Sequence, residues 1–409
     1  PSKMKEADWT DPSNPVFSGT TADTPATVLS SFTAYYTALF AKKTIDPAQA
    51  RVCLDTLADP HSRRVLAPTA AKCDADISKD EIEGVINDLP SGKSPGPDRL
   101  PTRFYKTFSL QLVDILPNVF NESRSRGGLP DSCREGLISV LHKKGTREDP
   151  RMYRPITLLN CDYKILTRVL TQRMNEAVLQ FVSPCQNGFV PGGFIAENLM
   201  LLNLIKAYVE EEREEAFFLF LDMEKAFDRC SWDYLTEALE KIGFGEGFVR
   251  YVKLFYSHEK PPTRRINVNG RLGESFPLAS GVAQGCPLSP LLFLVITEAL
   301  SRLITTDANI KGVEIHGTHH KISQYADDGT LIGKPSDAPR FEAHIQTWCG
   351  ATAMTENATK REGLLIGSLR KHPERAPANV VGTWTPDGVP IRALGVPIGN
   401  NVDEHAWWE

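Results

Sequence analysis

The side chains best suited to chemistry in this chain of 409 residues are three aspartates near predicted strand ends. Asp222 follows an apolar run, and Asp327 lies 105 residues beyond it with Asp328 next to it. Hard divalent cations such as Mg²⁺ choose carboxylate oxygens of this kind, together with substrate phosphates. Two such ions can clamp the attacking and leaving oxygens of a phosphoryl displacement. Because isolated aspartates at strand ends are more often caps or turn residues, the surrounding sequence must decide between the two interpretations.

Two predicted strand segments position these carboxylates. The run Phe217–Leu221 is continuously apolar, as expected of a strand buried on both faces, and it ends at Asp222. Residues Ile322–Ile332 predict a hairpin whose strands join around the adjacent aspartates. Successive strand side chains point to opposite faces, so Asp327 and Asp328 cannot both face Asp222 from an ideal strand. A turn between them could relax that limit.

Other elements follow from caps, breakers and periodicity. Ser78 and Glu81 form a capping box ahead of a helical apolar stripe that stops at Pro90, and the turn formers of Ser91–Asp98 then require a loop. Leu137–Leu141 and Tyr153–Ile156 predict two strands joined by a basic turn. Further helices are predicted at Val28–Ala41, from Asn160 to Pro184, at Leu199–Val209, from Ser231 to Gly243 and from Pro290, and further strands at Arg265–Asn269 and Glu274–Pro277.

Composition describes a globular chain. With 41% hydrophobic and 24% charged residues and a net charge of −5, the sequence is neither disordered nor fibrous, and no global basic field indicates a nucleic-acid or membrane partner. The eight cysteines include no C-x-x-C pair, which favours reduced, buried thiols over a zinc site or a disulfide scaffold. Apolar stretches such as Leu291–Ile296 are too short to span a membrane. The start at Pro1 and the apolar end at Trp408 indicate a fragment of a longer polypeptide.

Local charge differs from the global sum. The segment Ser91–Arg173 contains 15 Lys or Arg and 8 Asp or Glu, a net charge of +7. Such a segment could attract phosphates, or its dispersed charges could simply keep a surface solvated.

Seven motifs in chain order, from about Leu89 to Gly399, resemble the reverse transcriptases of non-LTR (LINE-type) retrotransposons. They resemble the family's N-terminal fingers signature, its fingers hairpin and its motifs A to E. In this sequence the matching stretches are Leu89–Asp98, His142–Gly145 with Tyr153–Asn160, Leu221–Asp228, Gly281–Pro290, Tyr325–Asp328, Asn357–Lys360 and Leu394–Gly399.

The resemblance implies an α+β right-hand polymerase fold, with an antiparallel palm sheet packed on helices, N-terminal fingers and a largely missing thumb. The corresponding division is a linker and peripheral helix at 1–78, fingers with part of the palm at 79–215, the palm with motifs A to E at 216–399, and the start of a truncated thumb at 400–409.

Carried over position by position, the resemblance also implies roles for individual residues. Asp222, Asp327 and Asp328 match the metal-binding carboxylates, the Met223 carbonyl matches an additional ligand, and Lys360 matches a proton donor to the pyrophosphate. Without the resemblance, Lys360 would be read as an ordinary surface charge.

The resemblance assigns further residues to substrates. Lys143 and Arg154 match residues that hold the triphosphate, and Phe227, otherwise an ordinary core ring, matches a steric gate against the ribose 2′-hydroxyl. Gln284 and Gly285 match the loop against the incoming nucleotide. Nucleic-acid contacts are expected from Lys93, Lys144, Tyr325, Leu394 and Gly395.

The expected reaction is RNA-templated addition of dNTPs to a primer 3′-hydroxyl with two Mg²⁺ ions, for which Mn²⁺ can substitute. The expected partners are an RNA template and a DNA primer, with no membrane, and an endonuclease elsewhere in the polyprotein. From the family, the protein is expected inside the cell, in the nucleus or cytoplasm.

The sequence departs from the family at three positions and leaves alternatives open. The family often has Arg where Gly193 and Ala283 stand, and Thr where Gly329 stands. One alternative is therefore a catalytically decayed RNA-binding remnant of the element. An RNA-dependent RNA polymerase is the other, although Phe227 argues against it.

Overall fold

The computed structural model describes residues 3–12, 15–378, 380 and 382–402. These residues form an α+β protein with two compact units. Unit 1 comprises the described parts of Pro1–Thr44, Val65–Ala177 and Phe227–Leu292, and unit 2 comprises Ile45–Arg64, Val178–Ala226 and the described part of Phe293–Glu409. The chain therefore passes between the units several times, and motif A itself is divided, with Asp222 in unit 2 and Phe227 in unit 1.

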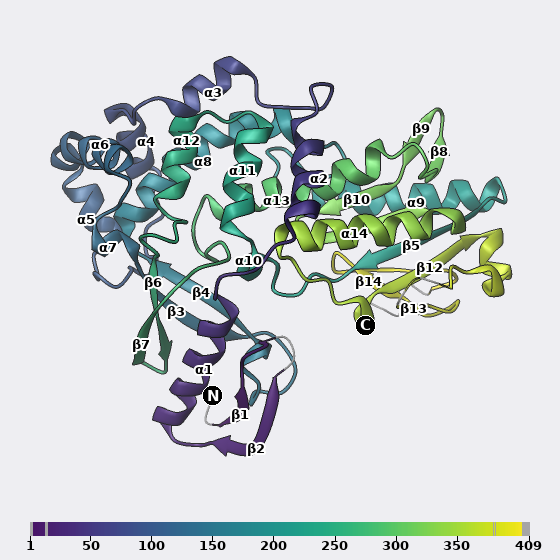
Figure 1. The fold of residues 1–409 in the computed structure, drawn as a ribbon, viewed down its shortest axis with the longest axis horizontal. Helices are drawn as coiled ribbons and strands as arrows, with labels where there is room; N and C mark the ends of the chain where they lie inside the picture. Colours follow the sequence, from purple (N-terminus) through teal and green to yellow (C-terminus); the bar gives the residue numbers. More distant parts are fainter. Residues whose placement is uncertain (1–2, 13–14, 379, 381, 403–409) are drawn as a thin grey trace. The chain divides into compact units, whose positions relative to one another are not determined.

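Unit 2 contains a five-stranded sheet in the order β10-β11-β5-β12-β13 (Figure 1). Its strand pairs are antiparallel except for β12 with β13. The strands are β5 (Glu215–Leu221), β10 (Ile322–Tyr325), β11 (Asp328–Gly333), β12 (Glu362–Gly367) and β13 (Thr383–Trp384). The predicted strand and hairpin are therefore confirmed, and the buried run of β5 lies at the centre of the sheet.

Both faces of this sheet are covered within unit 2. One face packs with α9 (Ile195–Glu211) and two small hairpins, β8 (Val313–Ile315) with β9 (Thr318–His320) and β14 (Ile391–Ala393) with β15 (Val396–Ile398). On the other face, the Phe217 ring meets Phe341 of α14 (Ala338–Thr352) edge-on, with ring centroids 6.2 Å apart. Helix α2 (Pro47–Ala58) packs against α14 (Figure 1).

Helix α13 (Ser289–Thr306) is the helix predicted from Pro290. Among the described residues it is the one helix long and apolar enough to cross a membrane, with a mean hydropathy of 1.3. However, 83% of its apolar window is buried inside the protein, as is typical of a core helix. In unit 2, the Trp348 indole donates to the Ile296 carbonyl of this helix at 2.8 Å.

Unit 1 contains a four-stranded sheet in the order β4-β3-β6-β7 (Figure 1). Strands β3 (Glu135–His142) and β4 (Tyr153–Leu159) form the predicted antiparallel hairpin, with a short 3₁₀ turn at Pro150–Met152 ahead of β4. Strand β6 (Thr263–Val268) pairs with β3 in parallel and with β7 (Arg271–Pro277) in antiparallel fashion. The basic turn of the hairpin thus extends from a sheet built from two distant parts of the sequence.

Helices make up the rest of unit 1. Ser78 and Glu81 form the predicted capping box, Ser231 caps α11, and Gly243 ends α11 with a φ of +110°. The helices are α3 (Ala67–Asp74), α4 (Lys79–Asn87), α5 (Thr102–Thr107), α6 (Ser109–Arg126), α7 (Asp131–Arg134), most of α8 (Cys161–Phe181), α10 (Ala226–Arg229), α11 (Trp232–Ile242) and α12 (Glu246–Lys253).

The first 78 residues contain more structure than the expected linker and single helix. Strands β1 (Met4–Asp8) and β2 (Val16–Ala22) form a hairpin, and α1 (Pro25–Leu39) is followed by α2 and α3. The α1 rings of Phe32 and Tyr36 are fully buried, and the Tyr36 hydroxyl donates to the Tyr153 carbonyl at 3.3 Å. This aromatic stripe packs on a strand more than 100 residues away, a partner that local composition cannot reveal.

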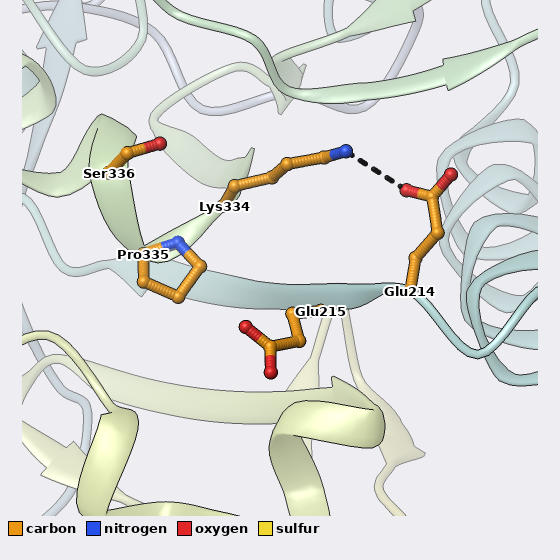
Figure 2. Close-up of a pocket in the computed structure, with 5 residues that line it drawn as sticks. All are labelled: Glu214, Glu215, Lys334, Pro335 and Ser336. Atoms are coloured by element: carbon orange, nitrogen blue, oxygen red, sulfur yellow. Dashed lines mark ion pairs between the residues drawn. The ribbon is translucent and has the colours of Figure 1, made fainter.

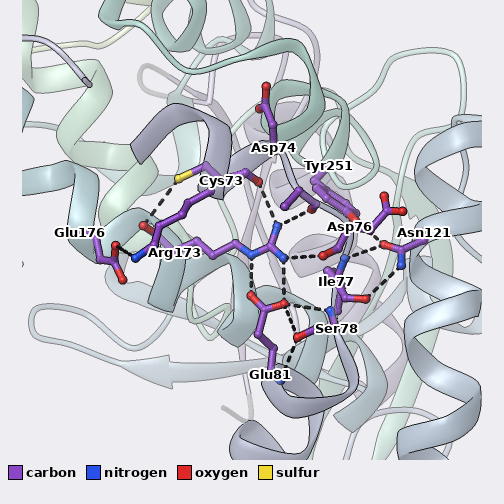
Figure 3. Close-up of polar contacts among 12 residues, drawn as sticks. Cys73, Asp74, Asp76, Ile77, Ser78, Glu81, Asn121, Arg173, Glu176 and Tyr251 are labelled. Atoms are coloured by element: carbon purple, nitrogen blue, oxygen red, sulfur yellow. Dashed lines mark hydrogen bonds and ion pairs between the residues drawn. The ribbon is translucent and has the colours of Figure 1, made fainter. Parts of the chain in front are cut away.

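A buried guanidinium fixes the segment between α3 and α4 in unit 1 (Figure 3). Arg173 on α8 donates two hydrogen bonds to the Glu81 carboxylate, at 2.6 and 2.8 Å. Its remaining three bonds, at 2.6 to 3.0 Å, reach the carbonyls of Cys73, Ala75 and Asp76. A guanidinium has five N–H groups, so all five are used. Arg124 of α6 adds a bond of 2.6 Å to the Asp74 carbonyl.

The eight cysteines are free of disulfide bonds, and six of them are buried. Burial raises the pKa of the Cys53 thiol to about 12, so this thiol stays protonated and unreactive at neutral pH. The prediction of buried thiols without disulfide bonds is confirmed for six of the eight cysteines, whereas Cys185 and Cys349 are partly buried.

Candidate active site

The aspartates of motifs A and C lie at the same end of two neighbouring strands in unit 2. Leu221 of β5 pairs with Gly329 of β11. Asp222 follows Leu221 and Asp328 precedes Gly329, so both residues lie at this end of the sheet. Both side chains are exposed, whereas Leu221 is buried. Strand register thus brings together two carboxylates that are more than 100 residues apart in the sequence.

Asp327 lies in the turn that joins β10 to β11. Tyr325 pairs with Asp328, so Ala326 and Asp327 form a two-residue hairpin loop. Of these two, Ala326 has a positive φ of 57°, the pattern of a type II′ turn that usually has glycine there. Asp327 is half-buried. The turn removes the restriction of strand alternation, since Asp327 is not part of either strand.

The backbone beside Asp222 is held by the segment that precedes β12. The Asn357 amide donates to the Asp222 carbonyl at 2.8 Å, and the Glu224 amide donates to the Thr355 carbonyl at 2.8 Å. Met223 forms an isolated antiparallel bridge with Glu356. Motif D therefore forms backbone contacts with motif A within unit 2.

Two basic side chains belong to this region. Lys360, in the 3₁₀ turn Ala358–Lys360, places its Nζ 3.6 Å from Asp222 Oδ2. The next residue, Arg361, is buried and forms ion pairs with Glu356 and Glu342, and these contacts raise its pKa despite burial. Arg361 thus anchors the segment that bridges Met223.

The donor chemistry of this sheet end suits a hard divalent cation, because Asp222, Asp327 and Asp328 all supply carboxylate oxygens. Within the described ranges, no group of three or more His, Cys, Asp or Glu side chains is gathered as a metal-binding cluster. The structure therefore brings the three carboxylates to one turn and one strand end, but does not arrange them as a complete ligand set.

The basic residues of the β3–β4 hairpin are in unit 1. Lys143 and Lys144 follow the last residue of β3, and Arg154 lies on β4 opposite Leu141. The Lys143 amide donates to the Met152 carbonyl at 2.9 Å, which closes the base of the turn. All three cationic side chains are exposed and can reach a ligand.

The motif B loop is attached to α10 and to β4, also within unit 1. The Val282 amide donates to the Phe227 carbonyl at 2.7 Å, and the Gln284 side chain donates to Asp228 Oδ1 at 2.9 Å. Gly285 has a φ of +124°, and a Cβ there would lie 2.4 Å from the Thr157 carbonyl oxygen, so only glycine fits. Phe227 is half-buried.

Of the remaining predicted contact residues, three occupy loops or turns and one ends a strand. Lys93 is exposed in the loop before α5. Leu394 and Gly395 form the two-residue turn of the β14–β15 hairpin, with φ values of 50° and 89°. Tyr325 is half-buried at the end of β10.

The departures from the family have different structural consequences. Gly329 lies in regular strand pairing, and a Cβ there would meet Leu221 at an ordinary 3.4 Å, so glycine is not required. At Gly193 a Cβ would lie 2.2 Å from the Asn187 carbonyl oxygen, so this backbone excludes the arginine common in the family. Ala283 is half-buried in the motif B loop.

A surface pocket of about 590 Å³ lies elsewhere in unit 2 (Figure 2). Its lining residues are Glu214, Glu215, Lys334, Pro335 and Ser336, and Lys334 pairs with Glu214 at 3.1 Å. This pocket is at the start of β5, whereas Asp222 follows the end of β5. Its lining includes none of the predicted site residues.

Sequence reasoning missed three residues that hold the backbone segments next to the aspartates. Gln186, Asn198 and Arg361 are buried polar residues. Gln186 contacts the motif C turn, Asn198 contacts strand β10 ahead of that turn, and Arg361 contacts the segment beside motif A. Arg361 could have been noticed because it directly follows Lys360. Gln186 and Asn198 carry no comparable signal, because the groups that they bind in motif C are more than 120 residues away.

Comparison with known proteins agrees with the motif resemblance. The family model for the reverse transcriptase (RNA-dependent DNA polymerase) matches residues 141–398. The chain is 30% identical over 355 residues to the transposon TX1 uncharacterized 149 kDa protein of Xenopus laevis, covering 86% of this chain and 26% of that protein. It is 28% identical over 278 residues to the RNA-directed DNA polymerase from mobile element jockey of Drosophila melanogaster, covering 67% of this chain and 29% of that protein.

A third relative is the Pol polyprotein from the type-2 retrotransposable element R2DM of Drosophila melanogaster, 26% identical over 288 residues, with 67% of this chain and 26% of that protein covered. The chain spans about a quarter of the length of these relatives. Their names confirm the predicted likeness to the enzymes of non-LTR retrotransposons. The chain belongs to the reverse transcriptase (RNA-dependent DNA polymerase) family.

Proposed function

We propose that this chain is the RNA-directed DNA polymerase of a non-LTR retrotransposon and that Asp222, Asp327 and Asp328 are its metal-binding carboxylates. The family implies a palm-type polymerase fold and generally uses divalent metal ions. The observation that carries the proposal is the pairing of Leu221 with Gly329, which brings motifs A and C to one sheet end.

In unit 2, the three carboxylates and the Met223 carbonyl would hold two Mg²⁺ ions, with Mn²⁺ as a substitute. When bound, these ions supply charge neutralisation at the attacking and leaving oxygens. The primer 3′-hydroxyl loses its proton to water and its oxygen bonds to the α-phosphorus of a dNTP, while the bond from that phosphorus to the oxygen bridging the β-phosphate breaks and pyrophosphate leaves. Lys360 donates a proton to that leaving group, a role that its exposure and its 3.6 Å contact with Asp222 support.

In unit 1, the assigned groups select and hold the nucleotide. Lys143 and Arg154 bind triphosphate oxygens, for which an exposed ammonium and a guanidinium are suited. Phe227 excludes the ribose 2′-hydroxyl, and Gln284 and Gly285 form a loop that contacts the nucleotide. Hydrogen bonds from this loop to α10 and β4 support a fixed loop position.

The proposal also assigns residues that contact the template and the primer. Lys93, Lys144, Tyr325, Leu394 and Gly395 contact an RNA template paired with a DNA primer. Residues 79–215 serve as fingers with part of the palm, 216–399 as the palm, and 400–409, of which 403–409 lie outside the described residues, as the start of a thumb. The endonuclease that provides a primer end belongs to another part of the polyprotein.

The class of nucleotide that is incorporated distinguishes this proposal from an RNA-dependent RNA polymerase. On an RNA template with a DNA primer and Mg²⁺, we expect dNTPs to be added and NTPs to be added poorly. Phe227→Ala should lower the preference for dNTPs about 10- to 100-fold, because a smaller side chain admits the 2′-hydroxyl. Single-nucleotide incorporation rates measure this ratio. A wild-type preference for NTPs would favour the RNA polymerase, and RNA binding without any extension would favour the non-catalytic remnant.

A further inference from the structure

The turn that carries Asp327 and Asp328 has a strained backbone with two buried polar groups. Ala326 has a φ of +57° and is 5% exposed. An alanine in this conformation is unfavourable because its Cβ crowds the backbone. Something must therefore compensate for the strain and satisfy the Ala326 amide and carbonyl.

One side chain satisfies both groups. Gln186, which is 3% exposed, accepts a hydrogen bond from the Ala326 amide at 2.8 Å through Oε1 and donates one to the Ala326 carbonyl at 3.1 Å through Nε2. The same Oε1 accepts from the Gly188 amide at 2.8 Å. A Cβ on Gly188 would lie 2.1 Å from the Ala326 nitrogen, so the backbone also approaches the turn closely.

Further bonds fix the segment that carries Gln186 against β10. The Asn187 amide donates to the Gln324 carbonyl at 3.0 Å, and the Gln324 amide donates to the Cys185 carbonyl at 2.7 Å. Asn198 of α9, 2% exposed, donates to the Gln324 carbonyl at 2.9 Å and to Ser323 Oγ at 2.8 Å. Asn187 donates to Asn198 Oδ1 at 3.1 Å. We call Gln186, Asn187 and Asn198 the amide bracket.

We infer that Gln186 is a positioning residue of this enzyme, which holds Ala326 so that Asp327 and Asp328 keep one orientation. The inference rests on the proposed function, because it is the carboxylates of that function that are positioned. Gln186 lies behind the turn and binds its backbone, so it acts through Ala326 and not on the substrate.

The test removes the three hydrogen bonds without removing volume. Gln186→Met should lower kcat for nucleotide addition about 10- to 100-fold, with KM for the dNTP changed less than about threefold, because misplaced reacting groups slow chemistry more than binding. In the double variant with Ala326→Gly, kcat should be at least about tenfold higher than in Gln186→Met alone, since glycine adopts a positive φ without strain. The melting temperature of each variant, measured alongside kcat, separates this effect from a general loss of folding.

Asn400→Leu is the matched control. Asn400 is a 1% exposed amide of unit 2 that donates to the Leu365 carbonyl at 2.8 Å, away from the turn. It should lower the melting temperature with kcat changed less than about twofold, as expected of a lost buried hydrogen bond that is remote from the reaction. Wild-type kcat in Gln186→Met, or a loss that Ala326→Gly leaves unchanged, would overturn the inference.

Hydrogen exchange separates this inference from the proposed function. In wild-type protein the amides of residues 322–330 should exchange slowly, and in Gln186→Met they should exchange faster while other strands of the sheet keep their protection. Unchanged exchange would refute the bracket even in an active enzyme. If the wild-type chain does not extend primers, the proposed function fails, and the exchange result still decides whether Gln186 holds the turn.

Discussion

Replacing Asp222 with alanine should reduce primer extension at least about a thousandfold, because the reaction loses a carboxylate that neutralises the developing phosphate charge. Stability should change by less than about 0.5 kcal/mol, since the Asp222 side chain is 50% exposed and its ion pair with Lys360 is also exposed. Extension rate and thermal unfolding, measured on the same preparation, check both parts of this prediction.

Asp233→Ala is the control for Asp222→Ala. Asp233 has a similar exposure of 46% and a comparable ion pair, with Lys42 at 3.1 Å, but it lies on α11 in unit 1. Extension should stay near the wild-type rate in Asp233→Ala. Equal activity losses in the two variants would show that the Asp222 effect does not arise from a metal site.

Replacing Arg173 with methionine should cost about 3 kcal/mol of unfolding free energy. The change leaves the Glu81 carboxylate and three carbonyls without the guanidinium that binds them. This loss of unfolding free energy is at the low end of the range for a broken buried ion pair, because the Glu81 side chain is 29% exposed and its carboxylate can be partly rehydrated. Urea denaturation measures the difference.

Lys72→Met provides the control, because Lys72 also forms an ion pair with a residue of α8. Lys72 of α3 and Glu176 of α8 form a 2.7 Å ion pair whose side chains are mostly exposed, and the loss of such a pair should barely change stability. A destabilisation in Arg173→Met no larger than that in Lys72→Met would contradict the role given to the buried guanidinium.

The contact between Arg173 and Glu81 should also make the unfolding free energy depend on pH. Burial alone would raise the pKa of Glu81, but hydrogen bonds from Arg173 and Ser78 outweigh it and hold the pKa below its ordinary value. The stabilising contribution of Glu81 is therefore present at neutral pH and is lost as the pH falls through its lowered pKa. The stability difference between wild type and Arg173→Met should accordingly shrink at acidic pH.

The sequence was sufficient to predict the elements that depend on local patterns. The apolar run ending at Asp222 became the central strand β5, and Tyr325-Ala326-Asp327-Asp328 became a hairpin turn. The capping box at Ser78 starts α4 as predicted. These features depend on neighbours within a few residues, so they can be recognised from the chain alone.

Features that depend on distant partners could not be predicted. The register that pairs Leu221 with Gly329 joins strands from separate parts of the sequence, and local periodicity does not fix such a pairing. Gln186 lacks a signal for the same reason, because a buried glutamine is defined by the Ala326 backbone it binds. The glycine at 193 suggested a lost cation, whereas the structure gives a steric reason for it.

The metal-site assignment is best tested by primer extension by the purified chain on an RNA template, with a DNA primer, dNTPs and Mg²⁺, alongside Asp327→Ala. We expect wild-type protein to extend the primer, chelation of the metal to stop extension, and Asp327→Ala to give no product while remaining folded. Extension by Asp327→Ala at the wild-type rate would contradict the assignment of the metal site to the Ala326-Asp327 turn.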